Sequence, residues 1–344
     1  MKDLTQRVID FAKLEGASAV GIATVETLAG GPPTADITYV LPEAKSAVCF
    51  AFALDQALIP PFLMKKDRVS HERDNIRANT MASGTSIDLA RYLDQMGHPS
   101  YALTANNVYR KDTKRGALDM IPDVSLRYLA VSSGVAGFGL SGNVLTKEHG
   151  AAIILGAVIT SAELEPTAPV PEEENYCDGC GLCLASCASS MMDPKEKERV
   201  TLGEKEHTYS KRRTYLRCEF VCGGFTGLHP SGKWSTWSPG RFEIPESDGE
   251  FMGALAKGVK AYNQRPSMEG GFFHPLSKKK LNLTCGHCQL ICVPDREERK
   301  RRHRMLTESG CVVQEPDGSL QVVSPEEAAR QVAAMPAESR ALYE

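Results

Sequence analysis

The sequence lacks an apolar run of the roughly 18 residues that a membrane-spanning helix needs. Its N-terminus, "MKDLTQRVIDFAKLEG", also lacks the apolar core and small-residue cleavage site of a secretory signal. Neither sign of charge dominates, because 40 basic residues stand against 43 acidic ones. This balance excludes a chain built to coat nucleic acid or an acidic membrane. We therefore expect a cytoplasmic protein with no membrane span and predict no nucleic-acid partner.

The length and composition suit a protein with a sizeable core. The chain has 344 residues, of which 42% are hydrophobic and 24% are charged. This is ordinary globular composition, and the length is enough for one large or two modest domains. No repeat with a period of roughly 20–50 residues is present, so a solenoid is not expected.

Cysteine is abundant and clustered. Nine of the 11 cysteines lie between residues 177 and 292. In a cytoplasmic protein this pattern predicts metal binding rather than disulfides. Cys49, in the apolar run "SAVCFAFAL", and Cys311 are interpreted as buried small hydrophobic residues.

Residues 1–165 alternate between helical and strand-like patterns, which predicts a layered α/β domain within an α+β chain. Helices are predicted at 3–15, at 70–97 as one long or two broken helices, and at 124–134. Strands are predicted at 18–25, 46–54 and 100–105, with a further pair around a turn at His149 and Gly150.

Proline and glutamate are enriched at residues 162–174, a composition typical of a linker. A cysteine-rich domain is predicted over residues 166–310, with an irregular insert at 223–250 and a charged helix at 295–310. Residues 311–344 are predicted to form a helical tail, in which Ser324 is the N-cap and Pro325 the first helical residue.

The stretch "NYCDGCGLCLASCASSM" contains four cysteines separated by two, two and three residues: Cys177, Cys180, Cys183 and Cys187. Such spacing supplies three thiolates to one [4Fe–4S] cluster and sends the fourth cysteine to a different cluster. In bacterial ferredoxins a proline usually follows the fourth cysteine, whereas Ala188 follows here. The donor set is unchanged, but the chain leaves the cluster without the stiffness of proline.

The remaining ligands come from "TCGHCQLICVPD", with Cys285, Cys288 and Cys292, and from "LRCEFVCGG", with Cys218 and Cys222. We predict that Cys292 joins the first trio. Cys187, Cys285, Cys288 and one of Cys218 and Cys222 then hold the second cluster. Structural zinc is the alternative, because zinc favours separated pairs and often takes histidine, and His287 lies within the second motif. The tandem spacing favours two iron–sulfur clusters.

These motifs resemble the ferredoxin half of epoxyqueuosine reductases and reductive dehalogenases. The stretch "SLRYLAVSSGVAGFGLSGNVLTKEHGAAIILGAVIT" looks like their helix, glycine-rich turn and strand pair. The resemblance covers about residues 1–20, 120–190 and 280–296. It implies a nitroreductase-like N-terminal domain followed by a ferredoxin-like domain with two [4Fe–4S] clusters and a cobalamin. It also implies that Cys218, which follows "KRRTYLR", completes the second cluster in preference to Cys222.

The glycine-rich stretch "GVAGFGLSGN" is interpreted as a loop that contacts the corrinoid, since glycine lets a backbone approach a ligand closely. A plain turn is the alternative, and a dinucleotide site is disfavoured because the stretch does not link a strand to a helix. The predicted cofactor-binding residues are Gly134, Gly137, Gly139, Ser141, Gly142 and Asn143.

The chain departs from both groups that it resembles. Epoxyqueuosine reductases carry an acidic residue about fourteen positions before the glycine-rich turn, where this chain has Met120, flanked by Asp119 and Asp123. About 50 residues follow Cys292, which is too few for the tRNA-gripping extension of those enzymes. The twin-arginine export signal of reductive dehalogenases is also missing. We therefore predict the superfamily and neither named reaction.

A reduction at carbon requires a proton donor as well as electrons. Tyr109, with Arg110 beside it to stabilise a phenolate, is one candidate, and Asp119 and Asp123 are candidate general acids. The alternative for Tyr109 and Arg110 is an ordinary polar loop with solvated charges. The basic residues between Arg296 and Arg304 are interpreted as a solvated helix face rather than a partner site, because acidic residues are interleaved with them.

Together these patterns predict an oxidoreductase that accepts electrons from a donor such as ferredoxin or flavodoxin. The electrons would pass through two [4Fe–4S] clusters to a cobalamin that reduces a small organic substrate. One alternative is an electron-transfer protein that reduces the corrinoid of a partner protein and holds none itself. A further alternative is a shortened epoxyqueuosine reductase, which acts on tRNA.

Overall fold

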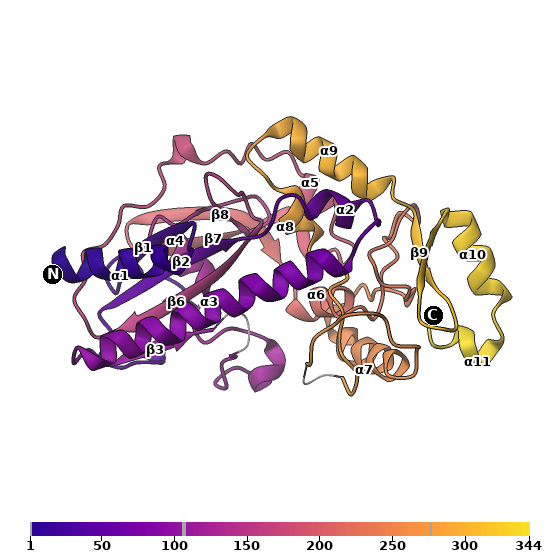
Figure 1. Ribbon diagram of the computed structural model, residues 1–344, viewed down its shortest axis with the longest axis horizontal. Helices are drawn as coiled ribbons and strands as arrows, with labels where there is room; N and C mark the ends of the chain where they lie inside the picture. Colours follow the sequence, from indigo (N-terminus) through magenta and orange to yellow (C-terminus); the bar gives the residue numbers. More distant parts are fainter. Residues whose placement is uncertain (1, 105–107, 275–276) are drawn as a thin grey trace.

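The computed structural model describes residues 2–104, 108–274 and 277–344. Its N-terminal part contains a helix, α1 (Lys2–Leu14), the strands β1 (Ala19–Thr24) and β2 (Ser46–Ala53), and a short helix, α2 (Ile59–Leu63). The long helix α3 (Val69–Gln95) follows, and then β3 (Ser100–Leu103), α4 (Leu126–Ser132), β4 (Gly137–Phe138), β5 (Val144–Leu145) and β6 (Ile153–Thr160). The predicted helices and strands of this part are present, but the strands on either side of His149 and Gly150 pair elsewhere, β5 with β4 and β6 with β2 and β3. Residue 105 of the predicted strand 100–105 lies outside the described residues. Helix α3 is a single unbroken helix (Figure 1).

The central sheet has the strand order β1-β2-β6-β3, and every neighbouring pair is antiparallel. Strand β2 lies inside the sheet and is buried along almost its whole length. Its large side chains, Val48, Phe50 and Phe52, pack toward α1 and α3, whereas its small ones, Ala47, Cys49 and Ala51, belong to the core on the α4 side. This alternation follows from the two-residue period of a strand. Cys49 is fully buried, as predicted.

A long β-hairpin completes the layer on the α4 side of the sheet. Its strands are β7 (Met192–Leu202) and β8 (Lys205–Arg212). Val200, Leu202 and Tyr209 of this hairpin are buried in the same core as α4 and the small side chains of β2. The hairpin lies within the predicted cysteine-rich domain, yet it packs against residues of the first 165.

The cysteine-rich part contains mostly short helices around irregular loops. They are α5 (Leu182–Ala185), α6 (Tyr215–Cys222), α7 (Phe251–Tyr262), α8 (His287–Ile291) and α9 (Arg296–Thr307). Helix α5 contacts α8 and α9, which brings the two cysteine motifs together near the middle of the molecule (Figure 1). Helix α9 confirms the predicted charged helix, and the predicted irregular insert at 223–250 has little regular structure.

The C-terminal tail differs from the helical prediction. Residues 311–323 form an antiparallel hairpin of β9 (Cys311–Gln314) and β10 (Leu320–Val323). Helices α10 (Pro325–Ala334) and α11 (Ala337–Arg340) follow it, and these elements lie at the opposite end of the molecule from the N-terminus (Figure 1). The Ser324 side chain accepts a hydrogen bond from the Glu327 backbone N–H, so the predicted start of α10 is confirmed.

Within the described residues, no helix is long and apolar enough to cross a membrane.

Candidate metal centres

The first cysteine group comprises Cys177, Cys180, Cys183 and Cys292. Gly179 and Gly181, between the first three cysteines, have φ angles of 70° and 73°, a conformation that favours glycine and turns the chain tightly. Cys177 and Cys292 lie in one small apolar cluster. Burial, together with the charges of Cys183 and Cys177, raises the pKa of Cys292 to about 12. Cys292 therefore lies against the trio, although it comes from a distant part of the sequence.

The second group comprises Cys187, Cys218, Cys222, Cys285 and Cys288. Burial raises the pKa of Cys288 well above its usual value, and the charges of Cys187, Cys218 and Cys285 act in the same direction. The Sγ atoms of Cys218 and Cys222, one helical turn apart on α6, are separated by 3.4 Å. Five thiols thus share this region, one more than a [4Fe–4S] cluster requires.

A single ion and an iron–sulfur cluster place different demands on the two cysteine groups. Among the residues that the structure describes, no three His, Cys, Asp or Glu side chains converge on a site for one metal ion. A zinc ion would need its donors at roughly 2.0–2.3 Å from one point. The thiolates of a cubane bind four separate irons at its corners, so their sulfurs surround the cluster instead of meeting.

Several N–H groups point at the cysteine sulfurs. The Leu140 backbone N–H donates to Sγ of Cys177 (3.2 Å), and Nδ2 of Asn143 donates to Sγ of Cys288 (3.6 Å). In proteins that hold iron–sulfur clusters, hydrogen bonds to the sulfurs help to set the reduction potential. Since Leu140 and Asn143 are three residues apart, one short loop contacts both cysteine groups.

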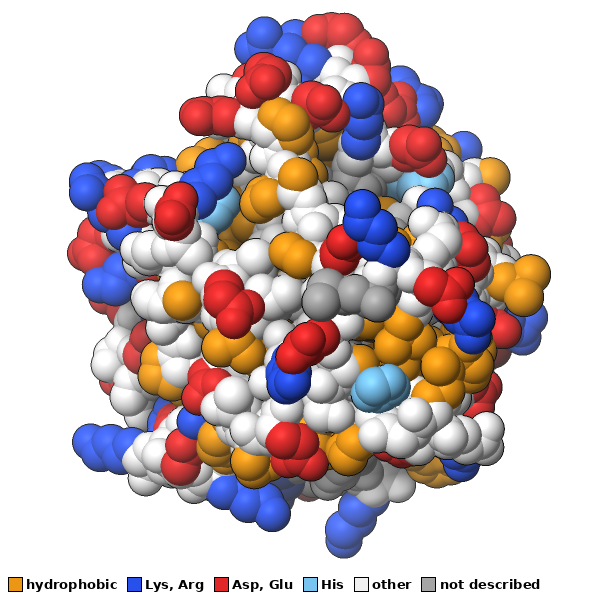
Figure 2. Space-filling view, turned by 90° about the vertical axis from the view of Figure 1, so that its left-hand side faces the viewer, with side chains coloured by type: hydrophobic (Ala, Val, Ile, Leu, Met, Phe, Trp, Pro, Cys, Tyr) orange, Lys and Arg blue, Asp and Glu red, His pale blue; other side chains and the backbone are white. Residues whose placement is uncertain are grey.

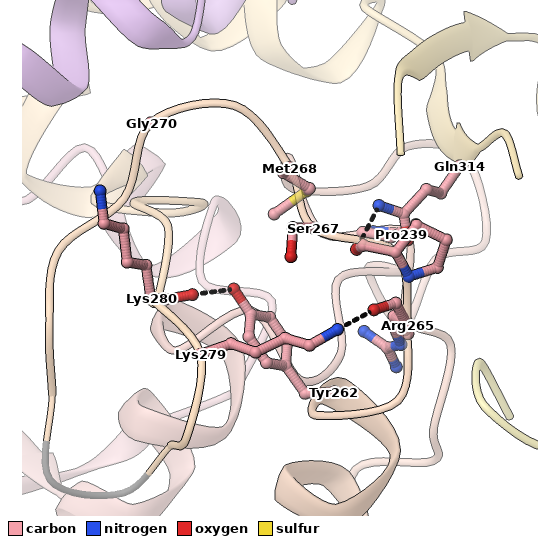
Figure 3. A pocket seen from close by; sticks show the side chains of 10 residues that line it. Pro239, Tyr262, Arg265, Ser267, Met268, Gly270, Lys279, Lys280 and Gln314 are labelled. Atoms are coloured by element: carbon pink, nitrogen blue, oxygen red, sulfur yellow. Dashed lines mark hydrogen bonds between the residues drawn. The ribbon is translucent and has the colours of Figure 1, made fainter. Parts of the chain in front are cut away.

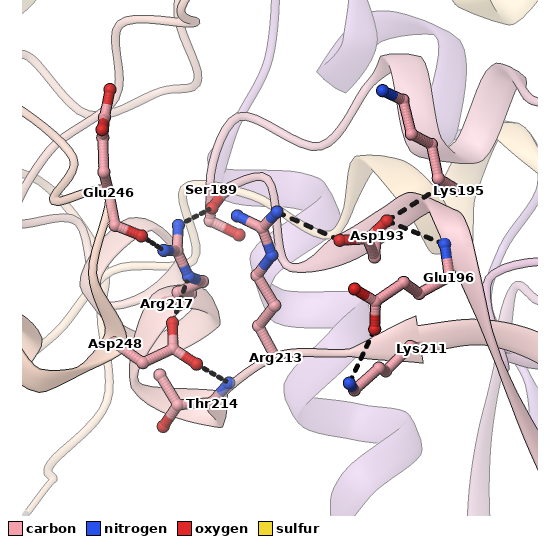
Figure 4. Close-up of polar contacts among 10 residues, drawn as sticks. All are labelled: Ser189, Asp193, Lys195, Glu196, Lys211, Arg213, Thr214, Arg217, Glu246 and Asp248. Carbon is pink, nitrogen blue, oxygen red and sulfur yellow. Dashed lines mark hydrogen bonds and ion pairs between the residues drawn. The ribbon is translucent and has the colours of Figure 1, made fainter.

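The chain leaves Cys187 without proline but is held by hydrogen bonds. The Met191 backbone N–H donates to Sγ of Cys187 (3.4 Å), and the Cys187 Sγ and Ser189 Oγ lie 3.3 Å apart. Arg217, whose side chain is 2% exposed, donates to the Ser189 carbonyl and forms an ion pair with Asp248 (2.7 Å; Figure 4). Because Arg217 precedes Cys218 on α6, this brace ties two members of the second group together.

A buried carboxylate fixes the chain just before Cys285. Glu72 of α3 is 1% exposed and accepts hydrogen bonds from the backbone N–H groups of Gly271 (2.7 Å) and Leu283 (2.6 Å). Arg68 donates to the same carboxylate at 2.7 Å. The long helix of the N-terminal part therefore positions the second cysteine motif.

We expect Glu72→Ala to lower the free energy of unfolding by about 3–5 kcal/mol, because it leaves the Arg68 charge buried and unpaired. Urea unfolding of the intact chain, followed by circular dichroism, measures the change. Arg73→Ala, at the exposed neighbouring position of α3, is the control and should change it by less than about 0.5 kcal/mol. Equal stability of the two variants would contradict the role given to Glu72.

Arg110 contacts an aromatic ring and a carboxylate. Its guanidinium lies over the Tyr39 ring, 3.7 Å from the centroid, and donates to both carboxylate oxygens of Asp112 at 2.9 and 2.7 Å. Burial raises the pKa of Tyr109, and the nearby charge of Glu219 raises it further. Consecutive side chains in an extended segment point to opposite sides, so Tyr109 and Arg110 diverge. The stabilisation of a Tyr109 phenolate by Arg110 stays a prediction.

The two candidate acids differ in their surroundings. Hydrogen bonds from the Arg115 backbone and side chain lower the pKa of Asp119. Burial raises the pKa of Asp123, and this effect outweighs the charge of Arg110 nearby. A raised pKa keeps a carboxyl protonated at higher pH, as a general acid requires. Of the two predicted acids, Asp123 is the better suited.

The glycines of the predicted corrinoid loop face other parts of the protein. A Cβ atom added to Gly134 would lie 2.0 Å from the Ala168 carbonyl oxygen, and one on Gly142 would lie 2.8 Å from the Tyr209 ring. Added Cβ atoms would also meet Asn175 and Leu145 at the remaining two positions, Gly137 and Gly139. Close internal packing thus accounts for these glycines.

Sequence reasoning missed a polar cluster beside this loop. The Tyr215 hydroxyl accepts hydrogen bonds from Arg127 (3.0 Å) and Arg212 (3.4 Å). Burial alone would raise the pKa of Tyr215, but the two guanidinium charges outweigh it and the pKa lies below its usual value. Arg212 also donates to the carbonyl of Ser141 (3.0 Å) and to Oδ1 of Asn143 (2.7 Å). The Asn143 side chain and the Ser141 carbonyl therefore belong to this group of residues.

The basic helix α9 is not simply a solvated face. Arg299 and Arg302 are 4% and 5% exposed. Arg302 donates to the Leu290 carbonyl (2.8 Å), between the last two cysteines, and Arg299 pairs with Asp178 (3.1 Å). The view of the N-terminal end in Figure 2 shows basic and acidic side chains intermixed over that face.

Two cavities are lined by other residues. One of about 150 Å³ is lined by Tyr262, Arg265, Met268, Lys279 and their neighbours (Figure 3). The buried Arg265 beneath it donates to the carbonyls of Leu342, Gly224 and Phe225. Another cavity, of about 380 Å³, is lined by Phe220, Arg241 and Lys257, among others. Neither includes a residue that the sequence predicts as functional.

Comparison with known proteins supports the resemblance inferred from the motifs. No family model matches the chain. Over 180 residues the chain is 25% identical to an epoxyqueuosine reductase from Gloeobacter violaceus, and the match covers 52% of this chain and 51% of that protein. The chain thus spans about half the length of the curated relative it matches.

Two solved structures are similar to the chain. A catabolic reductive dehalogenase in complex with 3-bromo-4-hydroxybenzoic acid has a TM-score of 0.50 and 11% identity, and the match covers 99% of this chain and 38% of that one. An epoxyqueuosine reductase with an epoxyqueuosine-modified tRNA stem loop has a TM-score of 0.40 and 17% identity, covering 66% of this chain and 59% of that one. The chain shares the mixed helix-and-sheet fold of the dehalogenase.

Proposed function

We propose that this chain is a reductase that holds two [4Fe–4S] clusters. Cys177, Cys180, Cys183 and Cys292 would hold one, and Cys187, Cys218, Cys285 and Cys288 the other. The observation that carries the proposal is the sorting of nine cysteines from three stretches of sequence into groups of four and five. Each group contains the cysteine that the spacing assigns to it from the opposite motif.

The surroundings of the thiols fit clusters. Burial raises the pKa values of Cys183, to about 11, and of Cys187. Bound iron supplies the positive charge that keeps such thiols deprotonated. The N–H groups of Leu140, Asn143 and Met191 donate to the sulfurs from outside. When bound, the clusters accept and donate single electrons.

The exposure of the two groups suggests where a donor docks. Cys180 is exposed, whereas the cysteines of the second group are buried or partly buried. Arg299, which is buried, donates to Sγ of Cys180 (3.8 Å) and pairs with Asp178, so this edge of the first group presents the Asp178 carboxylate to solvent beside Cys180. We propose that a ferredoxin or flavodoxin delivers electrons at Cys180.

We propose a corrinoid as the acceptor, on the basis of the sequence similarity to an epoxyqueuosine reductase, with a nitroreductase-like domain to carry it and a ferredoxin-like domain to reduce it. The contacts of the predicted loop do not support cobalamin binding within this chain. Its glycines pack against protein atoms, and Ser141 and Asn143 are engaged by Arg212. We therefore derive no chemical step through cobalamin, and a small organic substrate remains part of the proposal.

The same observation favours a second function, in which the chain reduces the corrinoid of a partner protein. In that case the loop serves the cysteine groups, since Leu140 and Asn143 contact one group each. Both functions need the same two clusters, and they differ in whether this chain binds cobalt.

Anaerobic reconstitution with iron, sulfide and hydroxocobalamin tests both. We expect about eight irons per chain, as two [4Fe–4S] clusters require, with EPR signals from two reduced clusters. One cobalt per chain with a base-off Co(II) signal would establish a self-contained cobalamin reductase. Eight irons without cobalt would support the partner function. Stoichiometric zinc, or iron without cluster spectra, would overturn both.

A further inference from the structure

Two arginines beside the glycine-rich loop carry charges that no carboxylate balances. Arg127 of α4 and Arg212 of β8 are partly buried. Among the described residues, neither forms an ion pair, and their partners are neutral: the Tyr215 hydroxyl, the carbonyls of Gly142 and Ser141, and the Asn143 amide. An arginine guanidinium is not deprotonated in proteins, so Arg127 and Arg212 keep two positive charges beside the loop.

One of these charges is linked directly to the second cysteine group. Arg212 donates from Nη2 to Oδ1 of Asn143 (2.7 Å), and Asn143 donates from Nδ2 to Sγ of Cys288 (3.6 Å). The arginine fixes which end of the amide faces the sulfur, because the oxygen is engaged by the guanidinium. Arg127 is linked to the second cysteine group through Tyr215, which lies one turn before Cys218 on α6.

The first cysteine group has a different electrostatic setting. Arg299, whose nitrogen lies 3.8 Å from Sγ of Cys180, forms an ion pair with Asp178 (3.1 Å). The same carboxylate pairs with Arg296 (3.2 Å), and Cys180 and Asp178 are exposed. Salt and water screen exposed charges much more than buried ones. The charge of the exposed Arg296 is therefore screened, and the charge of the buried Arg299 is partly neutralised by its ion pair with Asp178.

We propose that Arg212, acting through Asn143 and assisted by Arg127, raises the reduction potential of the second cluster above that of the first. This inference rests on the proposed function, since it requires both clusters. Reduction adds one electron, and hence one negative charge, to a cluster and its four thiolates. A nearby uncompensated positive charge stabilises that added charge. A one-electron donor at Cys180 would first reduce the first cluster. The electron would then pass to the second cluster, which stays reduced while the first is oxidised again. Arg212 and Asn143 are positioning residues in this scheme.

The test is an anaerobic redox titration of the reconstituted full chain, followed by EPR, for the wild type, Arg212→Gln and Arg212→Lys. Lys211→Gln is the matched control, because Lys211 is the exposed neighbour of Arg212 and pairs with Glu196. Cys288→Ser and Cys292→Ser assign each signal to its cluster. We expect Arg212→Gln to retain about eight irons and to weaken the electron affinity of the second cluster about tenfold, or ~59 mV for a one-electron couple. Arg212→Lys should shift it less.

Unchanged potentials in Arg212→Gln, or equal shifts of both clusters, would overturn the inference while leaving the two clusters intact. If Arg212→Gln loses iron, the same titration of Asn143→Leu tests the inference instead. That variant should lower the potential of the second cluster, and a wild-type potential would overturn the inference. A wild-type chain with fewer than two clusters would overturn the proposed function itself, which the iron count reveals separately.

Discussion

Replacement of Cys292 by Ser should remove about four of the eight irons and abolish the EPR signal of the first cluster, even though Cys177, Cys180 and Cys183 remain. The reason is the position of Cys292, which packs against Cys177 and Tyr176 at the start of the first motif. Its backbone is fixed there, because the Ala151 N–H donates to the Cys292 carbonyl (2.9 Å). A serine hydroxyl at this position is a far weaker iron ligand than a thiolate, and few other donors lie near.

Iron and sulfide analysis with EPR measures this loss. Cys49→Ala is the control, because Cys49 is buried inside β2 and lies in neither group. The control should keep all the iron. If Cys292→Ser instead lost the second cluster, the motifs would not exchange ligands. If it lost nothing, Cys292 would not be a ligand.

The parts of the fold that the sequence predicted are those with local signals. Strand β2 is a continuous apolar run, and α1 ends where Gly16 takes a φ of 96°. The hairpin of β7 and β8 was missed because its sequence, "MDPKEKERVTL", is mostly charged. Its buried face consists of a few residues such as Val200 and Leu202, which become apolar contacts only once the sheet and α4 are in place. In this case tertiary packing overrides local preference.

The tail hairpin was missed although a signal was present. Asp317 and Gly318 form its turn, in which Gly318 has a φ of 94° and the Asp317 carboxylate accepts from the Ser319 N–H (2.9 Å). An Asp-Gly pair between two short apolar runs is a strong hairpin signal. The helix start at Ser324 was read correctly from the same segment, since capping depends on residues three apart.

The candidate site also has one part that was predictable from the sequence and one part that was not. The cysteine groups were predictable because the ligands of [4Fe–4S] clusters follow fixed short spacings. Each cluster needs four cysteines, so each motif must supply a ligand to the cluster of the other motif. The cluster of Arg127, Arg212 and Tyr215 was not predictable, because Arg127 and Tyr215 are 88 residues apart in sequence. They meet because α4, the end of β8 and the start of α6 converge beside the glycine-rich loop. The contact between Arg110 and the Tyr39 ring is likewise one that distance in sequence does not predict.

Cys218 and Cys222 should differ sharply when each is replaced by Ala. The charge of Cys218 raises the pKa values of both Cys187 and Cys288, so Cys218 lies close to these two predicted ligands. The pKa of Cys222 is raised by hydrogen bonds with Cys218 and Cys285, so Cys222 also lies close to two members of the set. We expect Cys218→Ala to lose the second cluster, about four irons, and Cys222→Ala to keep both.

The two variants control for each other, because both remove a thiol from the same face of α6 and their Sγ atoms are 3.4 Å apart in the intact chain. The opposite pattern would make Cys222 the ligand. Loss of iron in the double variant alone would mean that either thiol can complete the cluster, because the four-residue spacing on a helix brings both within reach. Arg217 bears on this result, since its brace to Asp248 and the Ser189 carbonyl holds the start of α6 against the Cys187 loop. The brace acts beside Cys218, one turn before Cys222, so the thiol that it positions most firmly is the one we expect to bind iron.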